Sequence, residues 1–171
     1  MAWTPPSTWF ASAILTAAQL NQQLRDNMKW LGDITLRDRA ARYPSAAQTL
    51  TTGSDTVLTF DTANGTQVGI TYSAGTFTIA TTGLYLVTAS VNYVANATGY
   101  RGLYIKKNGT GIRQMRTGAV ASVTTALSAS SVVSCAATDT ITINAQQTSG
   151  GNLDTVGTSA MWTSVEIIRL L

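Results

Sequence analysis

The sequence contains no histidine and a single cysteine, and only 11% of its residues are charged. Without histidine, the chain lacks the commonest general base and the commonest transition-metal ligand of proteins. One cysteine excludes both a disulfide framework and a thiolate zinc cluster. The acidic residues, 8 in all, show no paired spacing that would mark a glycosidase. We therefore expect no enzymatic activity, no metal and no cofactor.

A calcium site that uses Asp55, Asp61 and backbone carbonyls stays open as an alternative only on the precedent of the family that residues 75–89 resemble, which is named below. The sequence around them contains no D-x-D-x-D-G loop. Aspartate is also common at turns, where its side chain accepts hydrogen bonds from nearby backbone N–H groups. Turn capping is the favoured interpretation of both residues.

The chain also lacks the signals of nucleic-acid or membrane binding. Its net charge is only +3, and the basic residues are spread over the whole length. No run approaches the roughly 18 apolar residues of a membrane-spanning helix. The N-terminus has no basic stretch of the kind that opens a signal peptide. We expect a soluble protein that is made and assembled in a cytoplasm.

The composition changes near residue 44, where a charged segment containing tryptophan gives way to one rich in threonine, glycine and valine. We predict an N-terminal arm with a helix over 1–44 and a β domain, here called the head, over 45–171. Pro5 and Pro6 favour an extended conformation in the arm. Four charged residues are interpreted as a solvated linker between helix and head: Arg37, Asp38, Arg39 and Arg42.

The N-terminal part contains one predicted helix, over 17–31. Thr16 and Gln19 have the spacing of a capping box, and Gly32 is the residue expected just after the helix. Apolar residues recur at alternating three- and four-residue spacing, which gives one apolar stripe: Ala17, Leu20, Leu24, Met28 and Leu31. A helix this short is barely stable alone in water, so the stripe must pack against another surface.

The rest of the chain reads as short strands separated by turn signals, the pattern of an all-β sandwich or barrel. Asn108-Gly109 predicts a tight hairpin, because a type I′ turn needs two positive φ angles. Strict alternation predicts an inward face: Phe77, Ile79, Tyr85, Val87, Ala89, Val91, Tyr93, Leu127, Ala129, Ser131, Val133, Cys135, Ile141 and Ile143. On that face Cys135 is expected to be an inert, buried thiol.

The last predicted strand, 165–171, departs from this alternation because it has apolar residues on both faces. One face can fill the core, and the other must meet a second surface. Trp162 and the Leu84–Leu86 face of the central strand support such a surface. A second copy of the chain is the simplest partner.

The segment 75–89, which reads GTFTIATTGLYLVTA, resembles the signature of the globular head of complement's first component, among the tumour-necrosis-factor-like jelly rolls. Later pieces agree in order: 103–109, the strand 126–135 leading to 139–141, and the apolar C-terminal strand. The resemblance implies a mainly β, trimeric jelly-roll sandwich of about ten antiparallel strands, here preceded by the arm and one α-helix. It makes the two-sided strand and its neighbours the candidate trimer interface: Leu84, Leu86, Trp162, Ile167, Ile168 and Leu170.

Residues 3–31 resemble the opening of many tailed-bacteriophage virion proteins, through WTPPSTW, then LTAAQLN, then RDN and WL. In that family the segment is similar to an attachment or trimerisation module ahead of a variable head. The resemblance therefore implies a set of anchor residues that bind the particle: Trp3, Pro5, Pro6, Trp9, Phe10, Leu20, Leu24, Met28 and Leu31.

Five basic residues lie between positions 101 and 116 with no acidic residue among them. Such charges keep a sheet edge soluble and prevent edge-to-edge pairing. They would alternatively form a surface-binding patch toward an acidic capsid surface or an anionic cell-wall polymer. The candidate patch includes one tyrosine: Arg101, Tyr104, Lys106, Lys107, Arg113 and Arg116.

Together these patterns predict a structural phage protein that assembles in the bacterial cytoplasm and resides in the virion. It would be a homotrimeric capsid decoration or a short head spike or fibre, anchored through its N-terminus to other virion proteins. About forty residues precede the head, which is too few for a long fibre stalk. The alternative is a tail or collar protein whose head binds host surface saccharide, with Tyr93, Tyr100 and Tyr104 as stacking platforms.

Overall fold

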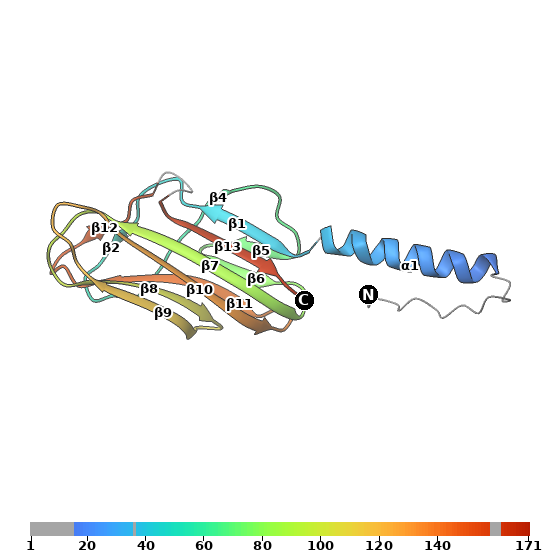
Figure 1. Ribbon diagram of the computed structural model, residues 1–171. Coiled ribbons are helices and arrows are strands. Elements are labelled where there is room, and N and C mark those ends of the chain that lie inside the picture. Colours follow the sequence, from blue (N-terminus) through green and yellow to red (C-terminus); the bar gives the residue numbers. More distant parts are fainter. Residues whose placement is uncertain (1–15, 36, 158–161) are drawn as a thin grey trace. The chain divides into compact units, whose positions relative to one another are not determined.

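The computed structural model describes residues 16–35, 37–157 and 162–171 (Figure 1). The anchor residues of the arm, Trp3 to Phe10, lie outside this part. The elements are α1 (Ala17–Thr35), β1 (Arg39–Tyr43), β2 (Thr49–Leu50), β3 (Thr56–Val57), β4 (Thr62–Ala63), β5 (Ile70–Ser73), β6 (Thr76–Ile79), β7 (Gly83–Tyr93), β8 (Tyr100–Lys107), β9 (Thr110–Gly118), β10 (Thr125–Cys135), β11 (Thr140–Gln147), β12 (Leu153–Asp154) and β13 (Ser164–Arg169).

The predicted start of the helix is confirmed. The backbone N–H of Gln19 donates to Thr16 Oγ1 at 3.2 Å, and the backbone N–H of Thr16 donates to Gln19 Oε1 at 3.1 Å. This reciprocal pair is a capping box. The predicted end is wrong, because α1 continues through Gly32 to Thr35. One glycine inside a helix costs only about 1 kcal/mol relative to alanine, so it need not end the helix.

The chain divides into two compact units between Arg37 and Asp38, rather than at residue 44. The interpretation of this region as a solvated linker is wrong for Asp38, Arg39 and Arg42. Asp38 is buried, and β1 pairs antiparallel with β13 through neighbours such as Ala40 and Ile167. Alanine is the only apolar residue type inside β1, so the hydrophobic signal of this strand is weak.

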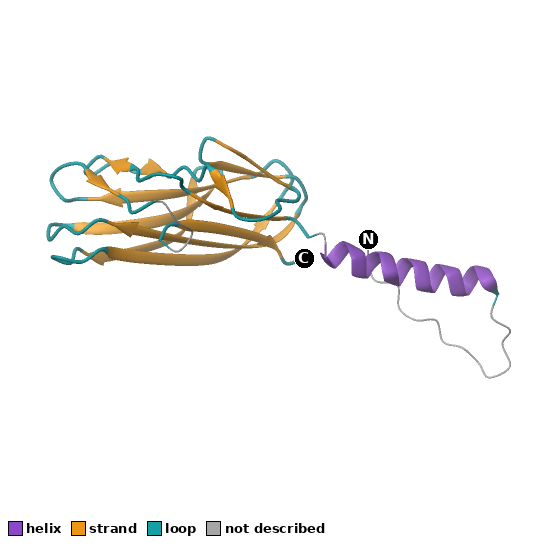
Figure 2. Cartoon of the chain, turned by 90° about the horizontal axis from the view of Figure 1, so that it is seen from above, coloured by secondary structure: helices purple, strands orange, loops and turns teal. Residues whose placement is uncertain are grey.

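The head contains two larger sheets. The first has the strand order β10-β7-β13-β1-β4, and the second has the order β5-β6-β11-β8-β9, with β3 paired beside β11. The pairings within both sheets are antiparallel, and β2 and β12 form a small third sheet. Figure 2 shows strands and loops throughout the head, with the described helix confined to the N-terminal unit. The predicted mainly β jelly-roll sandwich is confirmed, with several two-residue strands that the sequence pattern did not mark.

The core lies between the two larger sheets and consists of their inward-facing side chains. Almost all of the predicted inward face is buried, including Phe77, Tyr85 and Ile143, while Ser131 and Val133 near the end of β10 are half-buried. Complete burial of a large apolar side chain stabilises the fold by about 1.5–3 kcal/mol. The alternation of the strands therefore decides which face points outward.

The predicted hairpin at Asn108-Gly109 is confirmed, with φ of 48° and 78° at the two residues. It joins β8 to β9. Among the described residues, no helix has both the length and the apolar character required to cross a lipid bilayer.

Candidate functional site

The outward face of the first sheet carries apolar side chains that nothing in the described chain covers. Along β13, Val165 and Ile167 are buried in the core, whereas Glu166 and Ile168 point outward. Ile167 is 0% exposed and Ile168 is 42% exposed. Ile167 therefore cannot line an exposed interface as predicted, because strand alternation sends it into the core. Ile168 is the outward member of the pair.

Ile168 belongs to a continuous apolar row across three strands. Its register partner on β7 is Leu86, and the partner of Leu86 on β10 is Val132. We call Val132, Leu86 and Ile168 the outward row. Val132 is 55% exposed and was missed from the sequence, although alternation along β10 marks it as the outward apolar residue.

The remaining candidate interface residues lie at the two ends of this sheet. Leu84 and Leu170 are half-buried, and the backbone N–H of Leu170 donates to Leu84 O at 2.7 Å. Trp162 is exposed just before β13, and its carbonyl accepts a hydrogen bond from Asn92 Nδ2 at 3.0 Å. Five of the six candidate interface residues, all except Ile167, therefore lie on the outward face of this sheet or at its ends. Their role in joining copies of the chain stays a prediction.

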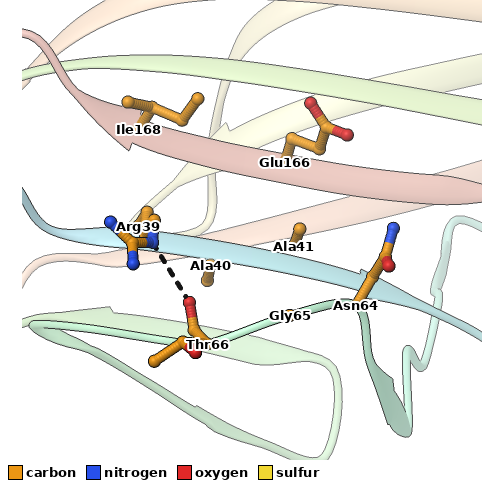
Figure 3. Close-up of a pocket in the computed structure, with 8 residues that line it drawn as sticks. All are labelled: Arg39, Ala40, Ala41, Asn64, Gly65, Thr66, Glu166 and Ile168. Atoms are coloured by element: carbon orange, nitrogen blue, oxygen red, sulfur yellow. Dashed lines mark hydrogen bonds between the residues drawn. The ribbon is translucent and has the colours of Figure 1, made fainter.

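A shallow groove of about 250 Å³ lies beside the outward row, between β1, β13 and the loop after β4 (Figure 3). Ala41 and Gly65 leave space in it because their side chains are small. Arg39 lines one end, where its Nε donates to the carbonyl oxygen of Thr66 at 3.3 Å. Glu166 places a carboxylate on the opposite wall.

Arg101 is not part of a surface patch, because its side chain is 0% exposed. Its guanidinium donates to the carbonyl oxygens of Asn96, Thr98 and Tyr100, each at 3.0 Å. Burial lowers the pKa of this guanidinium. Arg101 therefore holds the loop between β7 and β8, and the prediction that it binds a partner is wrong.

The two lysines of the predicted patch are paired with acidic residues from other parts of the chain. Lys106 Nζ contacts Asp55 Oδ2, and Lys107 Nζ lies 2.8 Å from Asp139 Oδ2. The hydrogen bond from Lys107 is the main reason that the pKa of Asp139 falls to about 2. The same contact raises the pKa of Lys107. These pairs leave two exposed arginines in the patch, both on β9: Arg113 and Arg116.

The predicted stacking platforms are largely occupied by the protein itself. Tyr93 is buried in the core, and its hydroxyl donates to Gly102 O at 2.5 Å, so it cannot stack against a saccharide. Tyr100 and Tyr104 both donate to Gln146 Oε1 at 2.8 Å. The Cζ atom of Arg116 lies 4.7 Å from the ring centroid of Tyr100 and 5.5 Å from that of Tyr104. A ligand would have to displace Arg116 to reach this side of the rings.

The apolar stripe of α1 is exposed where the structure describes its side chains. Leu20 is 46% exposed, Leu24 is 54% exposed and Met28 is 69% exposed. The side chain of Leu31 lies outside the described part. The helix therefore presents an apolar surface like the outward row of the head.

The described residues contain no group of three or more acidic, cysteine or histidine side chains that could hold a metal ion. The two carboxylates considered for calcium have different partners. Asp55 binds Lys106 and Asn144. Asp61 accepts one hydrogen bond from the Ser45 hydroxyl and a second, at 2.6 Å, from the Ser45 backbone N–H, and these two bonds lower its pKa. Cys135 is buried as predicted, and burial raises the pKa of its thiol.

No protein-family model matches this sequence, and no curated protein is significantly similar to it. Solved structures do share its architecture. Murine APRIL, in a crystal structure at pH 5.0, superposes with a TM-score of 0.61 and 12% identity, over 78% of this chain and 99% of that chain. The head is similar in fold to the tumour-necrosis-factor jelly roll. Eiger TNF from S. frugiperda gives the same TM-score of 0.61 with 11% identity, over 79% of this chain and 93% of that chain.

The tumour-necrosis-factor-like fold is the one that the resemblance of residues 75–89 implied. At these identities the likeness concerns the fold, so function has to come from the surfaces of this chain. The most distinctive surface on the described head is the outward face of the first sheet, which joins the outward row to the groove at Glu166.

Proposed function

We propose that the chain is a structural protein of a bacteriophage particle, in which three copies form a compact capsid decoration or short head spike. The outward row carries the proposal, because three large apolar side chains from adjacent strands lie together on the outward face of the first sheet. Apolar surface of this kind is stabilised when another protein surface removes it from water. The jelly-roll fold and the resemblance of residues 75–89 favour identical copies as that surface.

The helix supports the second half of the proposal, attachment to a particle. Leu20, Leu24 and Met28 are exposed on α1, so the stripe is available to bind a virion protein or the same stripe of other copies. The resemblance of residues 3–31 to the opening of phage virion proteins favours the former. Assembly then takes place in the bacterial cytoplasm, and the mature location is the virion.

The experiment is to purify particles from the producing bacterium and to locate the chain by gold labelling in electron micrographs. Gold on the capsid supports the decoration or head spike. Gold on the tail or collar would replace it with the alternative, in which the head binds host saccharide. Intact particles that lack the chain would overturn the structural role altogether.

A further inference from the structure

Charged side chains of the head have partners within the chain almost without exception. Asp55 pairs with Lys106, Asp139 with Lys107, and Asp38 lies 4.0 Å from Arg169. The other charged side chains donate or accept hydrogen bonds: Arg39, Arg42, Asp61, Arg101, Arg116 and Asp154. Within the described head, the structure records no hydrogen bond and no ion pair for the side chains of Glu166 and Arg113. One acid and one base therefore remain.

These two residues belong to opposite layers of the sandwich. Glu166 points outward from β13, the middle strand of the first sheet, whereas Arg113 lies on β9, an edge strand of the second sheet (Figure 1). The core separates the two sheets, and Glu166 points away from it. A contact between them therefore requires two copies of the chain.

The surroundings of Glu166 suit a long cationic side chain. The groove beside it has a volume of about 250 Å³ and small residues, Ala41 and Gly65, in its lining. An arginine can lay its aliphatic stem along such a surface and place its guanidinium on the carboxylate. Ile168 lies two residues along the same strand and adds an apolar contact.

The surroundings of Arg113 match this arrangement. Arg113 and Met115 are two residues apart on β9, and both are exposed, Met115 at 39%. Their register partners on β8, Ile105 and Leu103, are fully buried. Arg113 and Met115 therefore lie on the same face of the second sheet as these core residues, but at its exposed edge. Residues two apart on a strand are separated by about 6.7 Å, the same spacing as Glu166 and Ile168.

We propose that Arg113 of one copy enters the groove beside Glu166 of the next copy, while Met115 packs on Ile168 of the outward row. The proposal rests on the trimer of the proposed function and names the residues that join its copies. Different surfaces meet in this contact, and a contact between different surfaces generates a closed ring when the rotation returns to the first copy. It also gives Glu166 and Arg113 the ionic partner that each lacks within the described chain.

Charge reversal in the full-length chain tests the pair. The dissociation constant of the trimer is measured by analytical ultracentrifugation for Glu166→Arg, Arg113→Glu and the double variant. Each single reversal places like charges together and should weaken the trimer about tenfold or more. The double variant should return to within about threefold of the unmodified chain. Arg116→Glu is the matched control, because it makes the same charge change on the same strand and should leave the constant within about threefold.

The possible outcomes distinguish a failure of the Glu166–Arg113 contact from a failure of the proposed trimer. If the single variants remain as tight as the unmodified chain, or the double variant does not recover, the pairing is wrong while the trimer stands. If Arg116→Glu weakens the trimer as much as Arg113→Glu, net charge explains the effect and the pairing is again wrong. A monomeric unmodified chain would overturn the proposed trimer first. Should a reversed variant fail to fold by circular dichroism, the same constants are measured for Glu166→Gln and Arg113→Gln, which should each weaken the trimer.

Discussion

The pKa values of individual charged residues in the head depend on contacts with residues that are far away in the sequence. Asp139 is the clearest case, because its carboxylate accepts hydrogen bonds from Lys107, Asn108 and the Ala136 backbone, which together hold its pKa at about 2. Its ordinary value is 3.8. A folded pKa below the unfolded value means that this group stabilises the fold above about pH 4.

Replacing Lys107 by methionine should raise the pKa of Asp139 toward its ordinary value, since Lys107 is the largest cause of the shift. The stabilisation by Asp139 is complete above its unfolded pKa and is lost as the pH falls through about 2. The variant should therefore be less stable than the unmodified chain at pH 7 and nearly equal to it at pH 2. Carboxyl NMR titration and denaturant unfolding at the two pH values measure this. An unchanged titration midpoint would contradict the role of Lys107.

The partners of Arg101 are close in sequence instead, because its guanidinium donates to the carbonyl oxygens of Asn96, Thr98 and Tyr100 in the loop that precedes it and at its own strand. Arg101→Met should lower the free energy of unfolding by about 2–4 kcal/mol, since carbonyls lose charged donors in a buried place. Gln114→Met is the control, because Gln114 is exposed on β9 and exposed substitutions of this kind usually stay within about 0.5 kcal/mol. Urea unfolding measures both variants. A small effect at Arg101 would mean that water can replace its guanidinium.

At the scale of elements, the sequence predicted those helix ends and turns that are stabilised by contacts between residues close in the chain. The start of α1 follows from Thr16 and Gln19, and the β8–β9 hairpin follows from Asn108-Gly109. Elements that depend on distant partners were missed. Strand β1 forms because β13 supplies its hydrogen bonds, and no signal within residues 39–43 shows this.

The helix stripe yields a test of attachment. Leu24→Asp should leave the unfolding midpoint of the head unchanged, because Leu24 is exposed on α1 in the other compact unit. It should abolish co-sedimentation with particles, since a charge would be buried at the anchor. Gln22→Asp is the matched control on the exposed polar face of the same helix, and it should co-sediment normally. Normal occupancy of the Leu24 variant on particles would contradict the anchor assignment.

The outward row yields a test of assembly. Ile168→Lys should give folded monomers, because the new ammonium would be desolvated in the interface without a partner. Thr71→Lys makes the same charge change at an exposed position on the second sheet and should remain a trimer. Sedimentation velocity separates the two species. A trimeric Ile168 variant would show that the outward row does not join the copies.

At the scale of the whole molecule, alternation and turn signals were sufficient to predict an all-β sandwich or barrel and about half of its core, and the resemblance of residues 75–89 implied the jelly roll. Core residues in short or irregular segments, such as Leu50, Leu58 and Phe60, were missed because no alternation marks them.

Alternation and turn signals could not resolve the candidate surface-binding patch. The six residues of the patch are close in sequence and were predicted to form one surface. The fold buries Arg101, however, and it pairs Lys106 and Lys107 with acidic residues from distant segments. Charge pairing between distant segments is a property of the tertiary structure, so the unpaired Glu166 and Arg113 became visible only in the folded chain.

The central claim is that identical copies associate through the outward face of the first sheet. The most direct test is the mass of the purified intact chain in solution, measured by multi-angle light scattering after size-exclusion chromatography. The account predicts a mass three times the 18.0 kDa of one chain. A mass equal to one chain, at concentrations where the protein is folded, would contradict it.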